Sequence, residues 1–139
     1  MTDPPQRRVI GIDPGRTKCG VAVVLEAGER LALDVVPTEA LAERLQARIG
    51  EGDVAAICVG HATTSDAVVA LCRRMWPDIP VAVVDESNTT LQARQRYYRD
   101  HPPRGLLRLV PRGLLVPKEP LDGYAALLIV ERFLKSAKP

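Results

Sequence analysis

The chain has 139 residues, of which 46% are hydrophobic, so it can bury one sizeable core and is predicted to form a single domain over residues 1–139. Its net charge of +2 indicates no class of partner, and its apolar runs stay well short of the roughly 20 residues that span a bilayer. The start of the chain is polar and contains proline, unlike a secretory leader. We therefore expect a cytoplasmic protein that does not enter a membrane.

Three cysteines limit the redox and metal chemistry of the chain. They are Cys19, Cys58 and Cys72, and no two of them have the CxxC spacing of a zinc site or a redox pair. We predict free, buried thiols, and an intermolecular disulfide is the remaining alternative.

Three short runs rich in β-branched residues are predicted to be strands. They cover residues 7–12, 19–25 and 31–36. The segments between them, DPGRTK and EAGER, contain turn-forming glycine, so an antiparallel meander is expected. Thr38 is predicted to cap an amphipathic helix that ends at Gly50. The apolar stripe of that helix consists of Leu41, Leu45 and Ile49.

Strands and helices alternate in the second part of the chain. Residues 53–60, DVAAICVG, form a nearly continuous apolar run, as a strand covered on both faces should. Residues 64–76 are predicted to be helical, and residues 79–86, IPVAVVDE, to form another buried strand. A helix over 87–99, a proline-rich arginine loop to 120 and a last helix to about 135 complete the order, which we write as βββαβαβα.

This order predicts an α/β fold with a mixed five-stranded sheet flanked by helices. A helical crossover returns the chain to the same edge, so the two later strands should run parallel. Ligands of such sheets bind beyond the strand ends. Asp13 follows the first strand and Glu86 ends the last one. If these two strands are central neighbours, their carboxylates meet.

Four segments carry a resemblance to a known family. GIDPGRTKCGVAV, AAICVG, VVDESNTT and LDGYAALLI occur in the same order and at similar spacing as the motif strands of YqgF proteins, also called RuvX. That family has an RNase H-like fold, and its members are assigned as Holliday junction resolvases and as nucleases that mature the 5′ end of pre-16S ribosomal RNA. The first segment also resembles the opening of RuvC resolvases, but the DE-x-x-TT element and the short length fit YqgF better. The resemblance covers essentially the whole chain.

The resemblance implies that Asp13, Glu86 and Asp122 are the catalytic, metal-binding acids of a divalent-metal-dependent endonuclease. Carboxylates are the ligands that Mg²⁺ or Mn²⁺ prefers, and two such ions can neutralise charge on the attacking and leaving oxygens. Each acid also has a structural reading, because Asp-Pro-Gly shapes turns and acids commonly start helices or end strands. Asp85 is the spare candidate, since a one-residue slip would exchange it with Glu86, and Glu119 is a weaker spare.

Residues 87–118 carry seven lysine and arginine side chains against Asp100 alone, a local charge of +6. Such a segment predicts contacts to a phosphate backbone, although a solvated helix face and loop would have the same composition. The predicted nucleic-acid-binding residues are Arg16, Lys18, Arg94, Arg104, Arg108, Arg112 and Lys118. Tyr97 and Tyr98 could stack on unpaired bases or could be core or dimer-contact residues. His101 is expected to be structural or exposed to solvent.

The chain departs from the family pattern at the edge of the proposed site. Ser87 replaces the usual arginine after the DE pair, and GHATT, with His61, replaces glycine-leucine-proline. Either a four-way DNA junction or a precursor ribosomal RNA could be the partner, and the chain could act as a homodimer. Two other functions stay open: an inert nucleic-acid-binding factor in ribosome assembly or transcription, and an ATP-binding half-domain of the actin-like type, whose phosphate-binding hairpin the first segment also resembles.

Overall fold

The computed structural model describes residues 6–85, 89–102, 105, 109 and 122–137. Five strands form one sheet in the order β3-β2-β1-β4-β5. The strands are β1 (Arg8–Asp13), β2 (Lys18–Leu25), β3 (Arg30–Pro37), β4 (Val54–Gly60) and β5 (Val81–Val84). The helices are the short 3₁₀ turn η1 (Thr38–Ala40), α1 (Leu41–Ile49), α2 (Ser65–Met75), α3 (Thr89–Asp100) and α4 (Asp122–Ala137).

The sheet has the mixed topology that the sequence predicts. β1 pairs antiparallel with β2, and β2 with β3, which is the expected meander. β4 pairs parallel with both β1 and β5, because the crossovers through α1 and α2 each return the chain to the same end of the sheet. The predicted α/β architecture, a mixed five-stranded sheet flanked by helices, is therefore confirmed. The predicted order βββαβαβα has one helix after the fifth strand, whereas two helices, α3 and α4, follow β5 in the structure.

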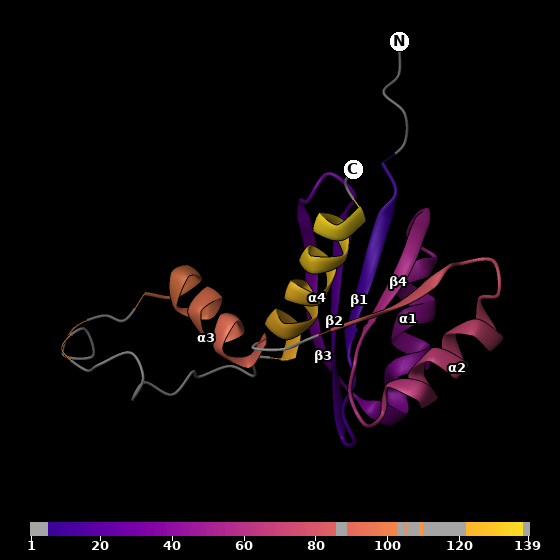
Figure 1. Ribbon diagram of the computed structural model, residues 1–139, viewed down its shortest axis with the longest axis horizontal. Coiled ribbons are helices and arrows are strands. Elements are labelled where there is room, and N and C mark those ends of the chain that lie inside the picture. Colours follow the sequence, from indigo (N-terminus) through magenta and orange to yellow (C-terminus); the bar gives the residue numbers. More distant parts are fainter. Residues whose placement is uncertain (1–5, 86–88, 103–104, 106–108, 110–121, 138–139) are drawn as a thin grey trace, which may run out of the picture.

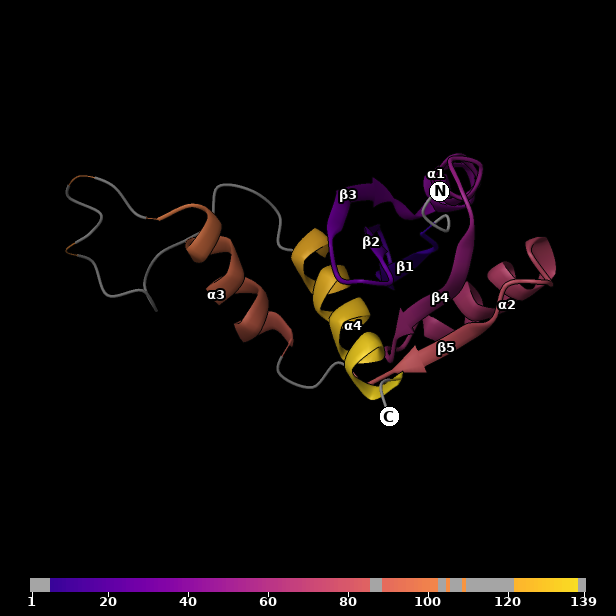
Figure 2. The same cartoon turned by 90° about the horizontal axis from the view of Figure 1, so that it is seen from above.

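Helices cover both faces of the sheet. Figure 1 shows α4 on one face and α1 and α2 on the other, and Figure 2 shows α3 beyond α4, further from the strands. The alternation of side chains along β1 divides the core accordingly: Val9 packs on the α4 side, and Ile10 and Ile12 pack on the other. Ile10 and Ile12 are fully buried, which stabilises the fold by about 1.5–3 kcal/mol for each side chain.

β5 is shorter and more exposed than predicted. It covers only Val81–Val84, whereas the sequence suggests a buried strand over 79–86, and it lies at the edge of the sheet with β4 as its one neighbour. Val83 keeps 49% of its surface exposed. The backbone nitrogen of Ile79 donates to the oxygen of Trp76, so the chain is still turning there. An apolar run alone does not distinguish a covered strand from an edge strand.

Thr38 does not cap α1 as predicted. The residue before α1 is Ala40, because the 3₁₀ turn η1 comes first, and no side chain caps that helix end. The hydroxyl of Thr38 instead donates to the oxygen of Gly15 at 2.9 Å, and its backbone nitrogen donates to the oxygen of Thr17. Thr38 thus holds the loop that follows Asp13.

Valine in place of Thr38 is expected to lower the free energy of unfolding by about 1 kcal/mol, because the side chain keeps its shape and loses the hydrogen bond to Gly15. Thr64→Val is the control, since Thr64 precedes α2 without making a side-chain cap bond. Urea denaturation of both variants measures the difference. Equal effects would show that the bond from Thr38 adds nothing.

All three cysteines are free and buried, as predicted. Burial raises the pKa of the Cys58 thiol to about 12 and that of Cys72 to about 11, so both stay protonated at neutral pH. In the part of the chain that the structure describes, no helix combines the length and apolar character needed to cross a membrane.

Candidate functional site

The end of β1 directs Asp13 toward the face of the sheet that carries α4. Side chains alternate along a strand, so Asp13 shares its face with Val9 and Gly11. Val9 belongs to the core cluster that α4 helps to form. A Cβ built on Gly11 would lie 2.6 Å from the carbonyl oxygen of Ala126 in α4. Asp13 therefore ends its strand on the side where the last helix packs.

The first turn of α4 lies directly against Gly20, the register partner of Asp13 in β2. A Cβ on Gly20 would lie 1.8 Å from the carbonyl oxygen of Asp122 and 3.0 Å from the nitrogen of Gly123. Only a residue without a side chain permits this approach. In Figure 1, α4 begins at the end of the sheet where β1 ends and runs back along it. Asp13 and Asp122, far apart in the sequence, thus flank the same glycine.

Asp122 pairs with a cation at the start of β2. Its Oδ2 atom lies 3.4 Å from Nζ of Lys18, the first residue of that strand. This oxygen is buried, and within the described residues it accepts no hydrogen bond, so the contact with Lys18 is an ion pair without hydrogen-bond geometry. The position of Asp122 in the first turn of α4 is the predicted one, and the positive end of the helix dipole favours an anion there.

Asp13 at the end of β1 and Asp122 at the start of α4 carry the kind of oxygen ligand that a hard divalent cation prefers. Across residues 6–85, 89–102 and 122–137, no group of three or more His, Cys, Asp or Glu side chains is arranged to hold a metal ion. A cation would satisfy the buried Oδ2 of Asp122, which lacks a hydrogen bond among the described residues. Asp13 and Asp122 are therefore candidates for two of the three predicted ligand positions, and the third predicted ligand, Glu86, lies outside the described residues.

β1, which carries Asp13, and β5, the strand that precedes Glu86 in the sequence, are not neighbours. The carboxylates of Asp13 and Glu86 are expected to meet if the first and last strands are neighbours. β4 lies between β1 and β5, so this condition is not met. Two strand spacings separate β1 from β5 by about 10 Å. The parallel strands nevertheless end at the same edge of the sheet, where Asp85 follows β5. The backbone oxygen of Asp85 accepts a 2.6 Å hydrogen bond from Nη1 of Arg132 in α4.

His61 directly follows β4 and so stands between those two strand ends. Its backbone nitrogen donates to the oxygen of Val84 in β5, and the residue is exposed. Nothing else in the described part of the chain assigns His61 a role.

The predicted nucleic-acid-binding residues lie in three places. Arg16 and Lys18 belong to the exposed β1–β2 loop and the start of β2, beside Asp13. Arg94 is half-buried in α3. Arg104, Arg108, Arg112 and Lys118 lie outside the described residues. Arg96 also belongs to the basic segment, but its Nη1 pairs with Glu131 of α4 at 2.6 Å, so this arginine connects two helices.

Tyr97 and Tyr98 belong to the core, which was the alternative to base stacking. Both are buried in the cluster between α3, α4 and the sheet. Their rings meet edge to face with centroids 5.1 Å apart, and Tyr97 also stacks on His101 at 4.6 Å. His101 is exposed, and its backbone nitrogen donates to the oxygen of Tyr97, which agrees with the expected structural or solvent-exposed position.

Side-chain hydrogen bonds of Asp100 connect the end of α3 to β3 and to α4. Its Oδ2 accepts hydrogen bonds from the Tyr124 hydroxyl at 2.9 Å and from Nη1 of Arg30 at 3.1 Å. Burial by itself would raise the pKa of Asp100, but these two bonds outweigh it and hold the pKa below its ordinary value. Burial and the bond to Asp100 raise the pKa of Tyr124, which keeps its hydroxyl protonated as the donor.

Phenylalanine in place of Tyr124 is expected to lower the free energy of unfolding by about 1 kcal/mol at pH 7, because Asp100 loses a hydrogen-bond donor. A group whose pKa is lower in the folded state stabilises the protein above its ordinary pKa, here 3.8, and loses that effect as the pH falls through the folded value. The difference from wild type should therefore shrink below pH 3.8, as measured by urea denaturation across pH.

Tyr98→Phe is the control for that experiment, since the Tyr98 hydroxyl is buried and has no hydrogen-bond partner among the described residues. It should be neutral or stabilising at every pH. A pH-independent effect of Tyr124→Phe would rule out Asp100 as the titrating partner.

Gly20 is the residue of this region that the sequence-based prediction does not include. A glycine inside an apolar strand indicates that another backbone segment approaches closely, and Gly20 in CGVAV is such a glycine. The pattern does not say which backbone approaches. That the approaching segment is the helix start with Asp122 is known only from the packing.

No protein-family model matches the chain, and no curated protein matches its sequence. Among solved structures, RuvC of Thermus thermophilus matches 94% of this chain and 97% of its own at 19% identity and a TM-score of 0.49. A ROK family glucokinase from Streptomyces griseus, solved with glucose and AMPPNP, matches 64% of this chain and 36% of its own at 24% identity and a TM-score of 0.44. Pelota of Archaeoglobus fulgidus matches 70% of this chain and 33% of its own at 11% identity and a TM-score of 0.44.

The chain spans about a third of the length of the ROK family proteins that it matches. At these identities and TM-scores, the likenesses concern the general fold and assign no activity. The function has to be argued from the residues at the end of β1.

Proposed function

We propose that this chain is a divalent-metal-dependent endonuclease that hydrolyses phosphodiester bonds in structured nucleic acid. The observation that carries the proposal is the packing of α4 against Gly20, which brings Asp122 to the strand end that bears Asp13. Both carboxylates come from rigid elements, a central strand and a helix start, and an active site needs such support to hold its geometry. Glu86 is the proposed third ligand.

The chain's own residues would divide the work at this site. Asp13 and Asp122 would hold Mg²⁺ or Mn²⁺, and such ions, when bound, supply charge stabilisation at the attacking and leaving oxygens. Arg16 and Lys18 occupy the exposed loop and strand start next to Asp13, where they would contact phosphates and position the strand without reading its sequence. The other predicted nucleic-acid-binding residues would extend that contact: Arg94, Arg104, Arg108, Arg112 and Lys118.

The direct test is cleavage. The purified chain is incubated with a labelled four-way DNA junction and, separately, with a precursor 16S ribosomal RNA fragment, in Mg²⁺ or Mn²⁺ and with EDTA as the control. We expect products from at least one substrate in the presence of metal and none with EDTA. The mass in solution with and without the junction shows whether two copies act together, since symmetric cutting of two strands needs two sites.

Two other outcomes would replace the proposal. Salt-sensitive binding without products, unaffected by Asp13→Asn, would identify an inert nucleic-acid-binding factor. A melting temperature that rises with AMPPNP, again without cleavage, would identify an ATP-binding half-domain.

A further inference from the structure

The ion pair between Lys18 and Asp122 joins two side chains of unequal exposure. The side chain of Lys18 keeps 55% of its surface exposed, and that of Asp122 keeps 29%. The contacted atom, Oδ2 of Asp122, is buried and accepts no hydrogen bond from any described residue. A flexible cation from the surface thus faces a carboxylate oxygen that the fold turns inward.

Electrostatic repulsion between carboxylates would explain why Lys18 pairs with Asp122. Asp13 is the register partner of Gly20, and the backbone of Asp122 packs against the same glycine. Two carboxylates that shared one metal ion there would repel each other when both are ionised. The Nζ of Lys18, at 3.4 Å from Oδ2, would offset that repulsion before a metal ion binds. A divalent ion at the same oxygen would do so more strongly, and the two cations would then repel each other.

Resting on the proposed function, we propose that Lys18 is a displaceable counter-ion of the metal site. Its ammonium group neutralises Asp122 in the empty site and leaves when Mg²⁺ or Mn²⁺ binds. Lysine suits this exchange, because a hydrated point charge on a flexible stem can turn to solvent, whereas a bidentate arginine would hold the carboxylate in place. The released ammonium group stays beside Arg16, in the loop that would contact phosphate.

The experiment measures metal binding without nucleic acid, by isothermal titration calorimetry of Mn²⁺ into the full chain. Lys18→Met removes the competing cation, and we expect it to bind Mn²⁺ about fivefold more tightly than wild type, the ratio typical of one partly exposed ion pair. Lys18→Gln repeats the test with a polar side chain. Lys18→Arg keeps the charge and should bind Mn²⁺ no more tightly than wild type.

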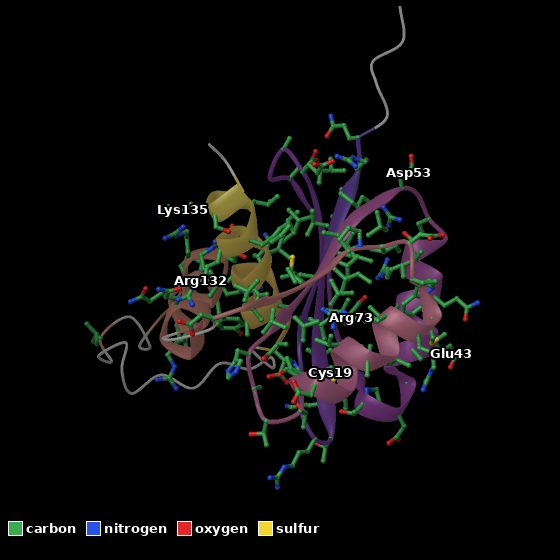
Figure 3. All side chains as sticks on the ribbon, turned by 45° about the vertical axis from the view of Figure 1, so that its right-hand side comes forward. Cys19, Glu43, Asp53, Arg73, Arg132 and Lys135 are labelled. Carbon is green, nitrogen blue, oxygen red and sulfur yellow. The ribbon has the colours of Figure 1, made fainter. Side chains whose placement is uncertain are left out.

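Lys135→Met is the matched control, because it removes the same charge from the exposed far end of α4. Figure 3 shows Lys135 at the opposite end of the molecule from Cys19, the residue after Lys18. Its Mn²⁺ affinity should equal that of wild type. Binding to Lys18→Met and Lys18→Gln that is no tighter than binding to Lys135→Met would overturn the exchange.

Asp122→Asn separates this inference from the proposed function. If wild type binds Mn²⁺, Asp122→Asn does not, and the Lys18 variants match wild type, then the metal site stands and the exchange is wrong. If wild type binds no Mn²⁺, or if Asp122→Asn binds it equally well, both the metal site and the exchange are overturned.

Discussion

Asparagine in place of Asp13 or Asp122 is expected to slow metal-dependent cleavage at least about a hundredfold, while nucleic-acid binding and the melting temperature stay close to wild type. The substitution keeps the size of the side chain and removes the charge that would hold the ion. Changes to groups that only orient metal ligands already cost about 10–100-fold, so the loss of a ligand should reach the upper end of that range. Single-turnover rates at saturating Mg²⁺ measure the effect, and Glu86→Gln should behave alike.

Asp53→Asn is the matched control for the charge change. Asp53 is exposed and precedes β4 at the opposite end of the sheet, where Figure 3 labels it far from Cys19. Its cleavage rate should equal that of wild type. Cleavage preserved by Asp13→Asn at saturating metal would remove Asp13 from the site, and equal losses in Asp53→Asn would trace the effect to overall charge.

Alanine in place of Gly20 is expected to lower the free energy of unfolding by about 3 kcal/mol, the upper range for overpacking. The added Cβ would lie 1.8 Å from the backbone oxygen of Asp122, so either β2 or the first turn of α4 must move. For a chain of this size the melting temperature should fall by roughly 10 °C. Because the shift moves Asp122 away from Asp13, the protein that remains folded should also lose Mn²⁺ affinity.

Gly50→Ala is the control for glycine replacement as such. Gly50 ends α1 with φ −68° and ψ −13°, and a Cβ added there would have its nearest neighbours at 3.4 and 3.6 Å, which is ordinary contact. The melting temperature of this variant should not fall. A Gly20→Ala protein as stable as Gly50→Ala would mean that α4 does not press on β2 at this point, and the link between Asp13 and Asp122 would be lost with it.

Local patterns in the sequence identify most of the elements. Apolar runs and turn glycines locate β1 to β4 to within a residue or two, and the start of α4 at Asp122 agrees with the predicted helix. These features follow from the residues' own periodicity and backbone preferences. The parallel placement of β4 and β5 also follows from the sequence, because a helical crossover leaves few other connections.

Other features depend on which segments meet. The apolar residues of β5 look like those of a covered strand, yet β5 forms the edge, and β4 separates it from β1. Tyr97 and Tyr98 have the spacing of a stacking surface or of a core, and only the packing of α3 against α4 assigned them to the core. The hydroxyl of Thr38 can form a hydrogen bond either with its own helix or with a distant loop. In the structure it donates to the backbone oxygen of Gly15.

The sequence by itself determined most of the strands and helices, the direction of the strands and the acids available for a site. Tertiary structure alone decided that Gly20 receives the start of α4 and that Lys18 faces Asp122. The physical reason is the distance along the chain over which each kind of interaction acts. Side-chain periodicity and turn preference act over a few residues, whereas the neighbour across a glycine or the partner of a charge is set by segments about a hundred residues apart that meet only when the whole core is buried.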